Sequence, residues 1–308
     1  MMRSFAVAQD DRLSGNCELK QEMKMGDLIK GKVVADVITQ EVKKAAEEIR
    51  QKGINPKLMI VRVGEREDDL AYERAALKRM EACNILCEVF NMPADISQED
   101  FASELKKVND DESVHGILLF RPLPKQINED DVKFIITPEK DIDCFNPINA
   151  AKVYEGDETG FPPCTPLAAM EILKYNKVNL KGSNAVVLGR SMVVGKPMVM
   201  LLLKEDATVT VCHSKTKNLS DITGNADILI AAIGKSQMVD GTFVKDGAVV
   251  IDVGINVDED GNMTGDVKTD ECIDIASMIT PVPGGVGSVT TAILAKHVIK
   301  ACRLLNKF

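Results

Sequence analysis

The sequence contains few of the residue patterns that build metal centres or disulfide frameworks. Its eight cysteines include no C-x-x-C pair, and its three histidines, His115, His213 and His297, lie far apart along the chain. A histidine-based metal site is therefore not expected, and no metal is assigned. Unpaired cysteines in a chain of 308 residues suit a reducing compartment better than a disulfide framework. We expect a cytoplasmic protein.

Long apolar runs are also absent. No stretch of about 18 apolar residues exists, so no transmembrane helix is predicted. Residues 1–22 lack the apolar segment of a secretory signal and contain Asp10, Asp11 and Glu18, so we expect a loosely ordered leader. Acidic residues outnumber basic ones by 47 to 38, which gives a net charge of −9. This balance argues against nucleic acid or an anionic membrane as the main partner.

The first half of the chain alternates between helical and strand patterns of apolar residues. Helices are predicted over 32–52, 68–83, 97–108 and 128–136, and strands over 57–63, 87–90 and 114–120. This alternation predicts a parallel sheet with helices packed on it. A passage rich in glycine and proline, residues 145–165, is the predicted crossing between two domains.

The second half contains short apolar strands separated by helices or turns. A helix is predicted over 166–175, and strands over 185–188, 207–212, 228–232 and 248–253. We predict a two-domain α/β protein whose C-terminal domain is a Rossmann-like, doubly wound parallel sheet, with a cleft between the domains. The predicted divisions are 1–22 (leader), 23–148 (N-terminal domain), 149–289 (dinucleotide-binding domain) and 290–308 (a helix returning to the N-terminal domain).

The stretch Ser183–Pro197 has the pattern of a phosphate-binding junction. A buried strand ends at Gly189, and a helical pattern resumes after Gly195. Such a junction presents unpaired backbone N–H groups and the positive end of a helix dipole, both of which favour an anion. Its glycine spacing differs from the common G-x-G-x-x-G, so the motif alone is weak, and a strand-turn-helix without a ligand stays open.

Five motifs occur in the order found in one enzyme family. The sequence resembles the methylenetetrahydrofolate dehydrogenase/methenyltetrahydrofolate cyclohydrolase family from about Met25 to Phe308. The motifs are Pro163-Cys-Thr-Pro166, Gly189-Arg-Ser-Met-Val-Val-Gly-Lys-Pro197, Thr208-Val-Thr-Val-Cys-His-Ser-Lys-Thr216, Val250-Ile-Asp-Val-Gly-Ile-Asn256 and Thr280-Pro-Val-Pro-Gly-Gly-Val-Gly287.

The resemblance implies a nicotinamide cofactor on the second domain and a folate pterin on the first. Arginine with hydroxyl groups suits a 2′-phosphate, and no acidic residue follows the strand at 207–212 to receive a free ribose diol. We therefore predict NADP rather than NAD. The residues that the resemblance places beside the cofactor are Thr165, Gly189, Arg190, Ser191, Gly195, Ser214, Gly254, Ile255, Gly287 and Thr290.

The folate side departs from the family pattern. The resemblance implies that Tyr72 stacks on the pterin, that Asp143 binds its amino and ring N–H groups, and that Pro122 and Leu123 contact the substrate. The family's catalytic lysine, four residues after the tyrosine, corresponds to Ala76, and the glutamine before its L-P-L-P turn corresponds to Phe120. Tyr72 and Asp143 are therefore the predicted catalytic residues.

Other departures follow the same alignment. Asp69 replaces the family serine, Cys144 and Ala168 replace glycines, and Ser288-Val289 replaces Pro-Met, so we expect altered side chains near the cleft. Position 76 shares a helix face with Tyr72, and position 78 lies roughly 200° around the helix from position 76, so Lys78 is predicted to be a surface lysine. Arg79, one turn from position 76, is an alternative basic group, although arginine exchanges protons poorly.

These residues predict an NADP-dependent methylenetetrahydrofolate dehydrogenase with weak or absent cyclohydrolase activity. Hydride transfer needs mainly alignment of two bound molecules, whereas hydrolysis needs a group that moves protons, and alanine cannot do so. An oxidoreductase acting on another pterin-like substrate and a non-catalytic binding homologue remain alternatives, as does a bifunctional enzyme that uses another basic group. The resemblance also implies a homodimer.

Overall fold

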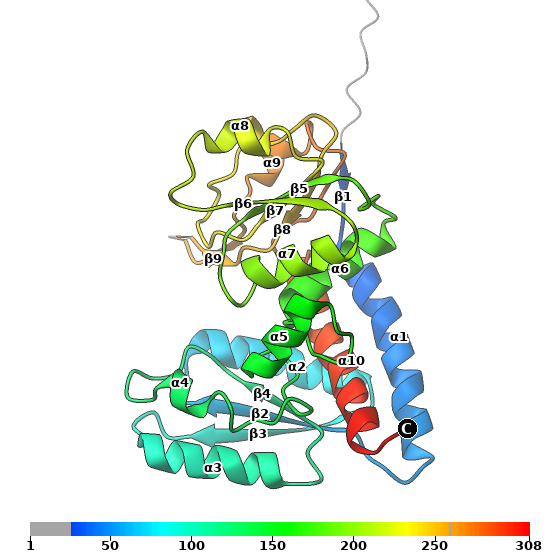
Figure 1. Cartoon of the computed structure of the whole chain (residues 1–308), viewed down its shortest axis with the longest axis vertical. Coiled ribbons are helices and arrows are strands. Elements are labelled where there is room, and N and C mark those ends of the chain that lie inside the picture. The colour runs from blue at the N-terminus through cyan, green and yellow to red at the C-terminus, as the bar shows by residue number, and fades with distance from the viewer. Residues whose placement is uncertain (1–25, 259) are drawn as a thin grey trace, which may run out of the picture.

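The computed structural model describes residues 26–258 and 260–308, and it contains two parallel sheets (Figure 1). The predicted leader, residues 1–22, lies outside the described residues. The smaller sheet has the order β3-β2-β4, with β2 at Lys57–Val63, β3 at Leu86–Met92 and β4 at Gly116–Leu119. The larger sheet has the order β1-β11-β8-β7-β5-β6. Its strands are Asp27–Leu28 (β1), Asn184–Leu188 (β5), Thr208–Cys212 (β6), Ile228–Ala231 (β7), Val249–Asp252 (β8) and Met278–Ile279 (β11).

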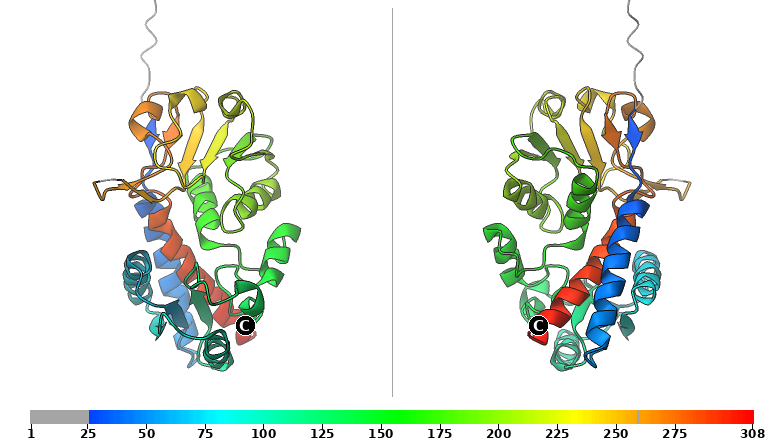
Figure 2. Two further views of the ribbon diagram at one scale, coloured as in Figure 1. Left: turned by 90° about the vertical axis from the view of Figure 1, so that its left-hand side faces the viewer. Right: turned by 90° about the vertical axis from the view of Figure 1, so that its right-hand side faces the viewer.

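Two long helices connect these sheets. Helix α1 (Gly31–Arg50) and helix α10 (Gly287–Leu305) run side by side from the larger sheet down to the smaller one (Figures 1 and 2). Helix α10 also contacts α2, α6 and β4. The other helices are Glu67–Ala82 (α2), Gln98–Asp110 (α3), Glu129–Val132 (α4), Pro147–Glu155 (α5), Cys164–Tyr175 (α6), Gly195–Lys204 (α7), Leu219–Thr223 (α8) and Thr269–Cys272 (α9), with a 3₁₀ turn at Gly241–Phe243.

The register of the larger sheet brings the ends of four strands to one edge. Leu188 of β5 pairs with Cys212 of β6 and with Ala231 of β7, and Ala231 pairs with Asp252 of β8. Because all these pairings are parallel, the loops that follow the four strands meet at the carboxyl edge of the sheet. The strand order reverses between β5 and β7, because β6 lies on one side of β5 whereas β7 and β8 follow on the other, and doubly wound sheets bind their ligands at such a point. The predicted fold class is confirmed.

The predicted crossing at 145–165 contains a helix that the sequence interpretation missed. Helix α5 begins after Asn146, whose side-chain oxygen accepts a hydrogen bond from the Ile148 N–H at 2.8 Å, and Pro147 occupies its first turn. It ends at Gly156, which has a φ of 73°. Asparagine, proline and glycine at these positions are ordinary helix boundary signals. The high glycine and proline content of residues 145–165 predicted a crossing between domains, and no helix was predicted there.

Several predicted boundaries were also wrong by a few residues. The strand predicted over 87–90 extends over Leu86–Met92 (β3), and the strand predicted over 114–120 covers only Gly116–Leu119 (β4). The helix predicted over 128–136 covers only Glu129–Val132. The last helix begins at Gly287 rather than at residue 290. Strand β1, near the start of the chain, pairs with β11 of the larger sheet, which no sequence pattern indicated. The antiparallel hairpin of β9 (Asn256–Val257) and β10 (Met263–Thr264) projects from the larger domain (Figure 2).

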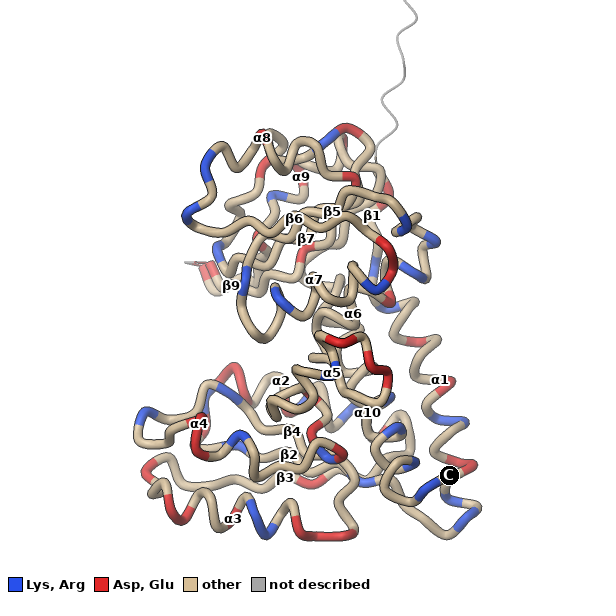
Figure 3. Tube along the Cα trace, in the orientation of Figure 1, with Lys and Arg blue, Asp and Glu red and all other residues tan. Residues whose placement is uncertain are grey.

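The largest apolar core lies around α1, α10 and α6 and reaches both sheets. It joins residues of β2 and β4, such as Ile60 and Leu118, to residues of β5 and β7, such as Val187 and Ile230. Burial of this shared core, at about 25 cal/mol per Å² of apolar area, connects the two domains through the long helices. Charged residues of both signs are interspersed over the two domains (Figure 3). Among the described helices, none is long and apolar enough to cross a membrane.

Candidate active site

The folate-side residues meet at one end of α2. Tyr72 lies on this helix, and its ring centroid is 5.7 Å from that of Phe120, with the two rings tilted by 50°. Phe120 follows β4 directly, and its backbone N–H donates to the Val61 carbonyl at 2.9 Å. Its side chain is only 6% exposed. The residue predicted at the family's glutamine position therefore contacts the tyrosine predicted to bind the pterin.

Ala76 lies on the same face of α2 and is completely buried. It belongs to the apolar core that also contains Met80, Leu118 and Phe120, and Tyr72 packs against this core. Lys78 is exposed, as predicted from its position around the helix. No proton-transferring side chain is present at position 76.

Asp143 is a half-buried carboxyl group that accepts a hydrogen bond from the backbone. Its Oδ1 accepts a hydrogen bond from the Cys164 N–H, at the start of α6, at 2.8 Å. Burial raises the pKa of Asp143 to about 6, although this hydrogen bond and the charge of Arg121 act in the opposite direction. Burial, together with Cys164 and Asp143, raises the pKa of Tyr72 well above 10. The Tyr72 phenol is therefore neutral at pH 7, and Asp143 is mainly ionised.

Cys144 adopts a backbone conformation that disfavours its side chain. Its φ is +60°, in the left-handed region where glycine is preferred. Burial and the neighbouring Asp141 and Asp143 raise the pKa of its thiol to about 12. A thiol with so high a pKa is protonated at neutral pH and is a poor nucleophile.

The expectation that each departure adds a side chain to the cleft was only partly correct. Ala168 and Val289 are completely buried within the large apolar core, so they change packing instead of the surface of a binding site. Asp69 forms a two-pronged ion pair with Arg66, at 2.9 and 2.7 Å, and Arg66 also donates to the Arg121 carbonyl at 3.1 Å. These contacts attach the start of α2 to the turn that contains Pro122 and Leu123.

The predicted phosphate turn has the required backbone geometry. Gly189, directly after β5, has a φ of +124°, and a Cβ there would lie 2.2 Å from the Ala232 carbonyl oxygen. A Cβ on Gly195, the first residue of α7, would lie 2.4 Å from the Gly189 carbonyl oxygen. Only glycine permits this close approach of strand end and helix start. The structure therefore confirms the predicted strand-turn-helix.

Ser191 organises the N-terminus of α7. Its hydroxyl oxygen accepts hydrogen bonds from the N–H groups of Val194 and Gly195, at 3.1 and 3.4 Å. Within the described part of the chain, the N–H groups of residues 190–193 have no hydrogen-bond acceptor. Unpaired N–H groups and a helix N-terminus fit a phosphate group, so these residues could hold a dinucleotide.

Of the remaining predicted cofactor residues, Thr165 lies in the first turn of α6, and the others lie along the same sheet edge or at the start of α10. Ser214 is exposed just after β6, and Gly254 and Ile255 follow β8. A Cβ on Gly287 would lie 3.9 Å from the Cδ1 atom of Ile255, so the start of α10 adjoins the loop after β8. The Thr290 hydroxyl donates to the Val286 carbonyl within this helix at 3.2 Å.

Two buried carboxylates hold the loops after β7 and β8. Asp266 accepts hydrogen bonds from three consecutive backbone N–H groups, those of residues 233–235, and from the Asn256 side chain. Asp252 accepts from the N–H groups of Gly254, Asp266 and Val267 at 2.9 to 3.0 Å. Burial raises the pKa of Asp252 to about 6. The Asp252 motif was visible in the sequence, but this loop-holding role was not.

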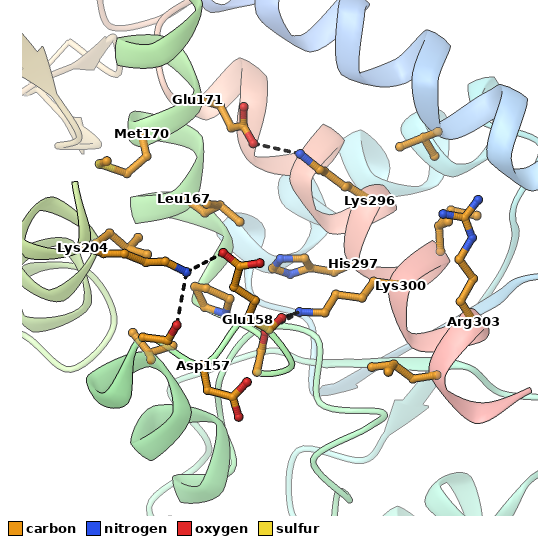
Figure 4. Close-up of a pocket in the computed structure, with 18 of the residues that line it drawn as sticks. Asp157, Glu158, Leu167, Met170, Glu171, Lys204, Lys296, His297, Lys300 and Arg303 are labelled. Atoms are coloured by element: carbon orange, nitrogen blue, oxygen red, sulfur yellow. Dashed lines mark hydrogen bonds and ion pairs between the residues drawn. The ribbon is translucent and has the colours of Figure 1, made fainter. Parts of the chain in front are cut away.

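A large groove lies away from the predicted site residues. Its volume is about 940 Å³, and α1, α6, α7 and α10 contribute to its walls (Figure 4). Lys204 pairs with Glu158 at 2.9 Å, and Lys296 pairs with Glu171 at 2.9 Å. None of the predicted folate or cofactor residues lines it. Size alone therefore does not identify the active site.

The fold and the turn geometry define a two-domain α/β protein with a dinucleotide-binding half. Comparison with known proteins agrees. Residues 163–306 match the NAD(P)-binding domain of tetrahydrofolate dehydrogenase/cyclohydrolase, and residues 29–143 match the catalytic domain of the same enzymes. The chain belongs to the tetrahydrofolate dehydrogenase/cyclohydrolase family.

Individual relatives match over nearly their whole length. The chain is 65% identical over 281 residues to the bifunctional protein FolD of Clostridioides difficile, covering 91% of this chain and 98% of that one. The crystal structure of the bifunctional enzyme FolD from Campylobacter jejuni superposes with a TM-score of 0.88 at 40% identity, covering 91% and 99%. FolD of Trypanosoma brucei, complexed with NADP cofactor and inhibitor, gives a TM-score of 0.87 at 36% identity, covering 92% and 100%.

Proposed function

We propose that the protein oxidises methylenetetrahydrofolate to methenyltetrahydrofolate by hydride transfer to NADP⁺, with weak or absent cyclohydrolase activity. The family assignment supports the folate reaction. The observation that carries the second part is the fully buried Ala76, which lies on the Tyr72 face of α2 within apolar surroundings. The other reading of the folate side, a different pterin-like substrate, has no contact in the structure that favours it.

The choice of NADP is supported by the surroundings of the phosphate turn. Arg190 is exposed beside the turn and forms no ion pair with any described residue, so its guanidinium is available to a 2′-phosphate. Strand β6 is followed by His213, Ser214 and Lys215, and no carboxylate is present there to bind a free ribose diol. The relative from Trypanosoma brucei was solved as a complex with NADP.

The chain's residues would contribute mainly binding and orientation. Tyr72 would stack on the pterin, and ionised Asp143 would accept hydrogen bonds from its N–H groups. The turn at 189–195 would hold the dinucleotide phosphates, and bound NADP⁺ supplies the hydride acceptor. The methylene carbon loses a hydride and becomes the methenyl cation, so this step requires no proton transfer from the protein.

Hydrolysis of the methenyl bridge has different requirements. Water must be activated and protons transferred, and a positioned acid or base contributes about 10²–10⁴-fold. Ala76 and Phe120 can do neither. Burial keeps the Tyr72 phenol protonated, and Arg79 donates hydrogen bonds to α1 and α10. The structural alternatives to a lysine at position 76 are therefore poor.

The test is to replace both residues and measure the two reactions separately. Purified protein is incubated with methylenetetrahydrofolate and either NADP⁺ or NAD⁺, and absorbance follows reduced nicotinamide and the methenyl product. We expect both signals to rise together with NADP⁺ and less with NAD⁺. We expect the Ala76→Lys/Phe120→Gln variant to hydrolyse the methenyl product about 10²-fold faster or more.

The controls separate charge from position. Ala75→Lys adds the same charge at the neighbouring, exposed position of α2 and should leave hydrolysis unchanged. Ala76→Lys alone buries an ammonium beside Phe120 and should be less stable than the double variant. A folded double variant that binds folate without gaining hydrolysis would disprove the role given to position 76. Absence of reduced nicotinamide with the unmodified protein would disprove the dehydrogenase assignment.

We also propose a cytoplasmic homodimer. The cysteines of the described chain are free thiols, in keeping with a reducing compartment. Strand β6 ends the larger sheet, and exposed apolar side chains surround it. Tyr154 of α5 and Met192 of the phosphate turn are 75% and 61% exposed, and both line a depression of about 440 Å³ with Val211 of β6. An unpaired edge beside exposed apolar residues favours pairing with another chain.

A further inference from the structure

Arg79 connects the helix of the folate side to the two long helices. It lies in the last turn of α2, and its guanidinium reaches α1 and α10 at the same time. Nη1 donates to the Thr39 hydroxyl of α1 at 2.6 Å, and Nε donates to the Thr291 hydroxyl of α10 at 3.2 Å. Nη2 donates to the Ser288 carbonyl of α10 at 3.4 Å. Three helices are therefore joined by one side chain.

Two of the groups that accept hydrogen bonds from Arg79 are hydroxyls of buried threonines. Thr39 and Thr291 are 7% and 5% exposed, and the Thr39 hydroxyl itself donates to the Ala35 carbonyl at 2.5 Å. Arg79 has no carboxylate partner among the described residues, so its charge is balanced only by hydroxyl and carbonyl dipoles. The planar guanidinium offers several donors in fixed directions, which an ammonium group cannot reproduce.

The contacts lie between the two halves of the proposed site. Tyr72 precedes Arg79 by seven residues, two helical turns, so both side chains lie on one face of α2, with Ala76 between them. Ser288 and Thr291 flank the α10 residue Thr290, and Gly287 adjoins Ile255 of the dinucleotide half. Arg79 thus bonds the helix that contains the proposed pterin-stacking residue to the helix end that contains the proposed cofactor residues Gly287 and Thr290.

The other polar side-chain contacts that attach α2 to its surroundings stay within the folate domain. Glu73 attaches α2 to β2 through Arg62, at 2.7 Å, but this ion pair lies within the folate domain. Arg66 and Asp69 attach α2 to the turn after β4, which belongs to the same domain. Among the described side chains of α2, Arg79 is the one that hydrogen-bonds to α10.

We infer that Arg79 is a positioning residue for hydride transfer, which sets the distance and angle between the folate-binding and nicotinamide-binding halves. This inference rests on the proposed dehydrogenase function. Displacement of reacting groups by about 1 Å can reduce a rate by about 10²-fold. Loss of the Arg79 contacts should therefore slow the chemical step while each binding half stays intact.

The experiment compares Arg79→Met and Arg79→Lys with the unmodified protein in the dehydrogenase assay. We expect Arg79→Met to lower kcat about 10- to 100-fold, with KM for folate and for NADP⁺ changed less than about twofold. The deuterium isotope effect on kcat, measured with substrate deuterated at the methylene carbon, should increase because hydride transfer becomes more rate-limiting. Arg79→Lys keeps the charge but replaces three donor nitrogens in a plane by one ammonium group, so it should recover only part of the loss.

Three further variants make the test specific. Thr291→Val removes the hydroxyl that accepts the hydrogen bond from Arg79 Nε, and it should decrease kcat less than Arg79→Met does. This variant replaces Arg79→Met in the test if Arg79→Met does not fold. A double-mutant cycle of Arg79→Lys with Thr291→Val should show coupling, since the two residues are in contact. Arg74→Met removes an exposed arginine from the opposite face of α2 and should leave kcat unchanged.

The outcomes distinguish this inference from the function on which it rests. An unmodified protein without turnover would contradict the proposed dehydrogenase activity. An active unmodified protein whose Arg79→Met variant has unchanged kcat and isotope effect, with only a lower melting temperature, would show that Arg79 is merely structural. A change confined to KM would likewise overturn the positioning role.

Discussion

Cys144 has a strained backbone conformation next to Asp143 of the proposed folate site. Its left-handed backbone, with a φ of +60°, costs a residue with a Cβ about 1–2 kcal/mol. Residue 144 follows Asp143, the proposed pterin ligand, and precedes Phe145, whose N–H donates to the Asp141 carboxylate at 2.9 Å. The backbone of this segment is therefore held by its neighbours against the preference of residue 144.

Substitution of Cys144 measures this strain. We expect Cys144→Gly to be more stable than Cys144→Ala by about 1 kcal/mol in urea unfolding. Alanine retains the strained Cβ, whereas glycine relieves it and loses only part of the gain to the larger entropy of its unfolded chain. Equal stabilities of the two variants would contradict the strain. Because both variants lack the thiol, the comparison is independent of its chemistry.

At the scale of elements, strand β6 and its neighbours form the exposed edge of the larger sheet. Val211 on this strand is 39% exposed and Leu203 on α7 is 48% exposed. A parallel sheet of this type is normally covered by helices on both faces, but an edge strand still has unpaired backbone groups. The combination makes this edge the surface at which we propose that two copies associate.

Lysine substitutions test this edge. We expect the unmodified protein to sediment at twice the mass of the chain and Val211→Lys to sediment as a monomer, because a lysine on an edge strand opposes pairing with a second chain. The matched control is Leu86→Lys, on β3 at the edge of the smaller sheet, which should remain dimeric. A dimeric Val211→Lys with a monomeric Leu86→Lys would locate the interface on the other domain.

At the scale of the whole molecule, the buried His297 links the long helix α10 to the segment of the N-terminal domain that contains Ile142. Its Nδ1 lies 2.8 Å from the Ile142 carbonyl oxygen, so the neutral imidazole donates there, and 3.7 Å from the Cys164 sulfur. Phe161 packs edge-on against the ring at 5.4 Å. Burial lowers the pKa of His297 to about 4, with the charges of Lys300 and Lys296 contributing in the same direction.

This shift predicts a pH-dependent contribution to stability. The unfolded histidine binds a proton below about pH 6.5, whereas the folded one does so only near pH 4. Its contribution is therefore present above pH 6.5 and lost as pH falls toward 4, by on the order of 3 kcal/mol. We expect the unfolding free energy of the protein, relative to His297→Asn, to decrease over this window. If the difference in unfolding free energy between the two proteins stayed constant over this window, the lowered pKa of His297 would be contradicted. Asp141 and Asp143 titrate in both proteins, so their contributions largely cancel in this difference.

Sequence patterns were enough to predict most of the helices and strands and the strand-turn-helix at residues 183–197. Apolar runs at 57–63 and 185–188 give buried strands because a parallel sheet is covered on both faces, and Gly189 and Gly195 allow a backbone approach that a Cβ forbids. The five motifs also indicated the family, and Lys78 faced outward because helical geometry is local. These conclusions depend on residues that are close together in the chain.

The contacts between residues far apart in the chain became visible only in the folded molecule. Arg79 and Ser288 are 209 residues apart, and Cys164 and Asp143 are brought together by the start of α6. The pairing of β1 with β11 and the roles of Asp252 and Asp266 likewise depend on chain closure. No local pattern reports such contacts, because they arise when the shared core brings α1, α6 and α10 together. Burial then shifts the pKa values of Asp143 and His297, which depend on surroundings that the linear sequence does not show.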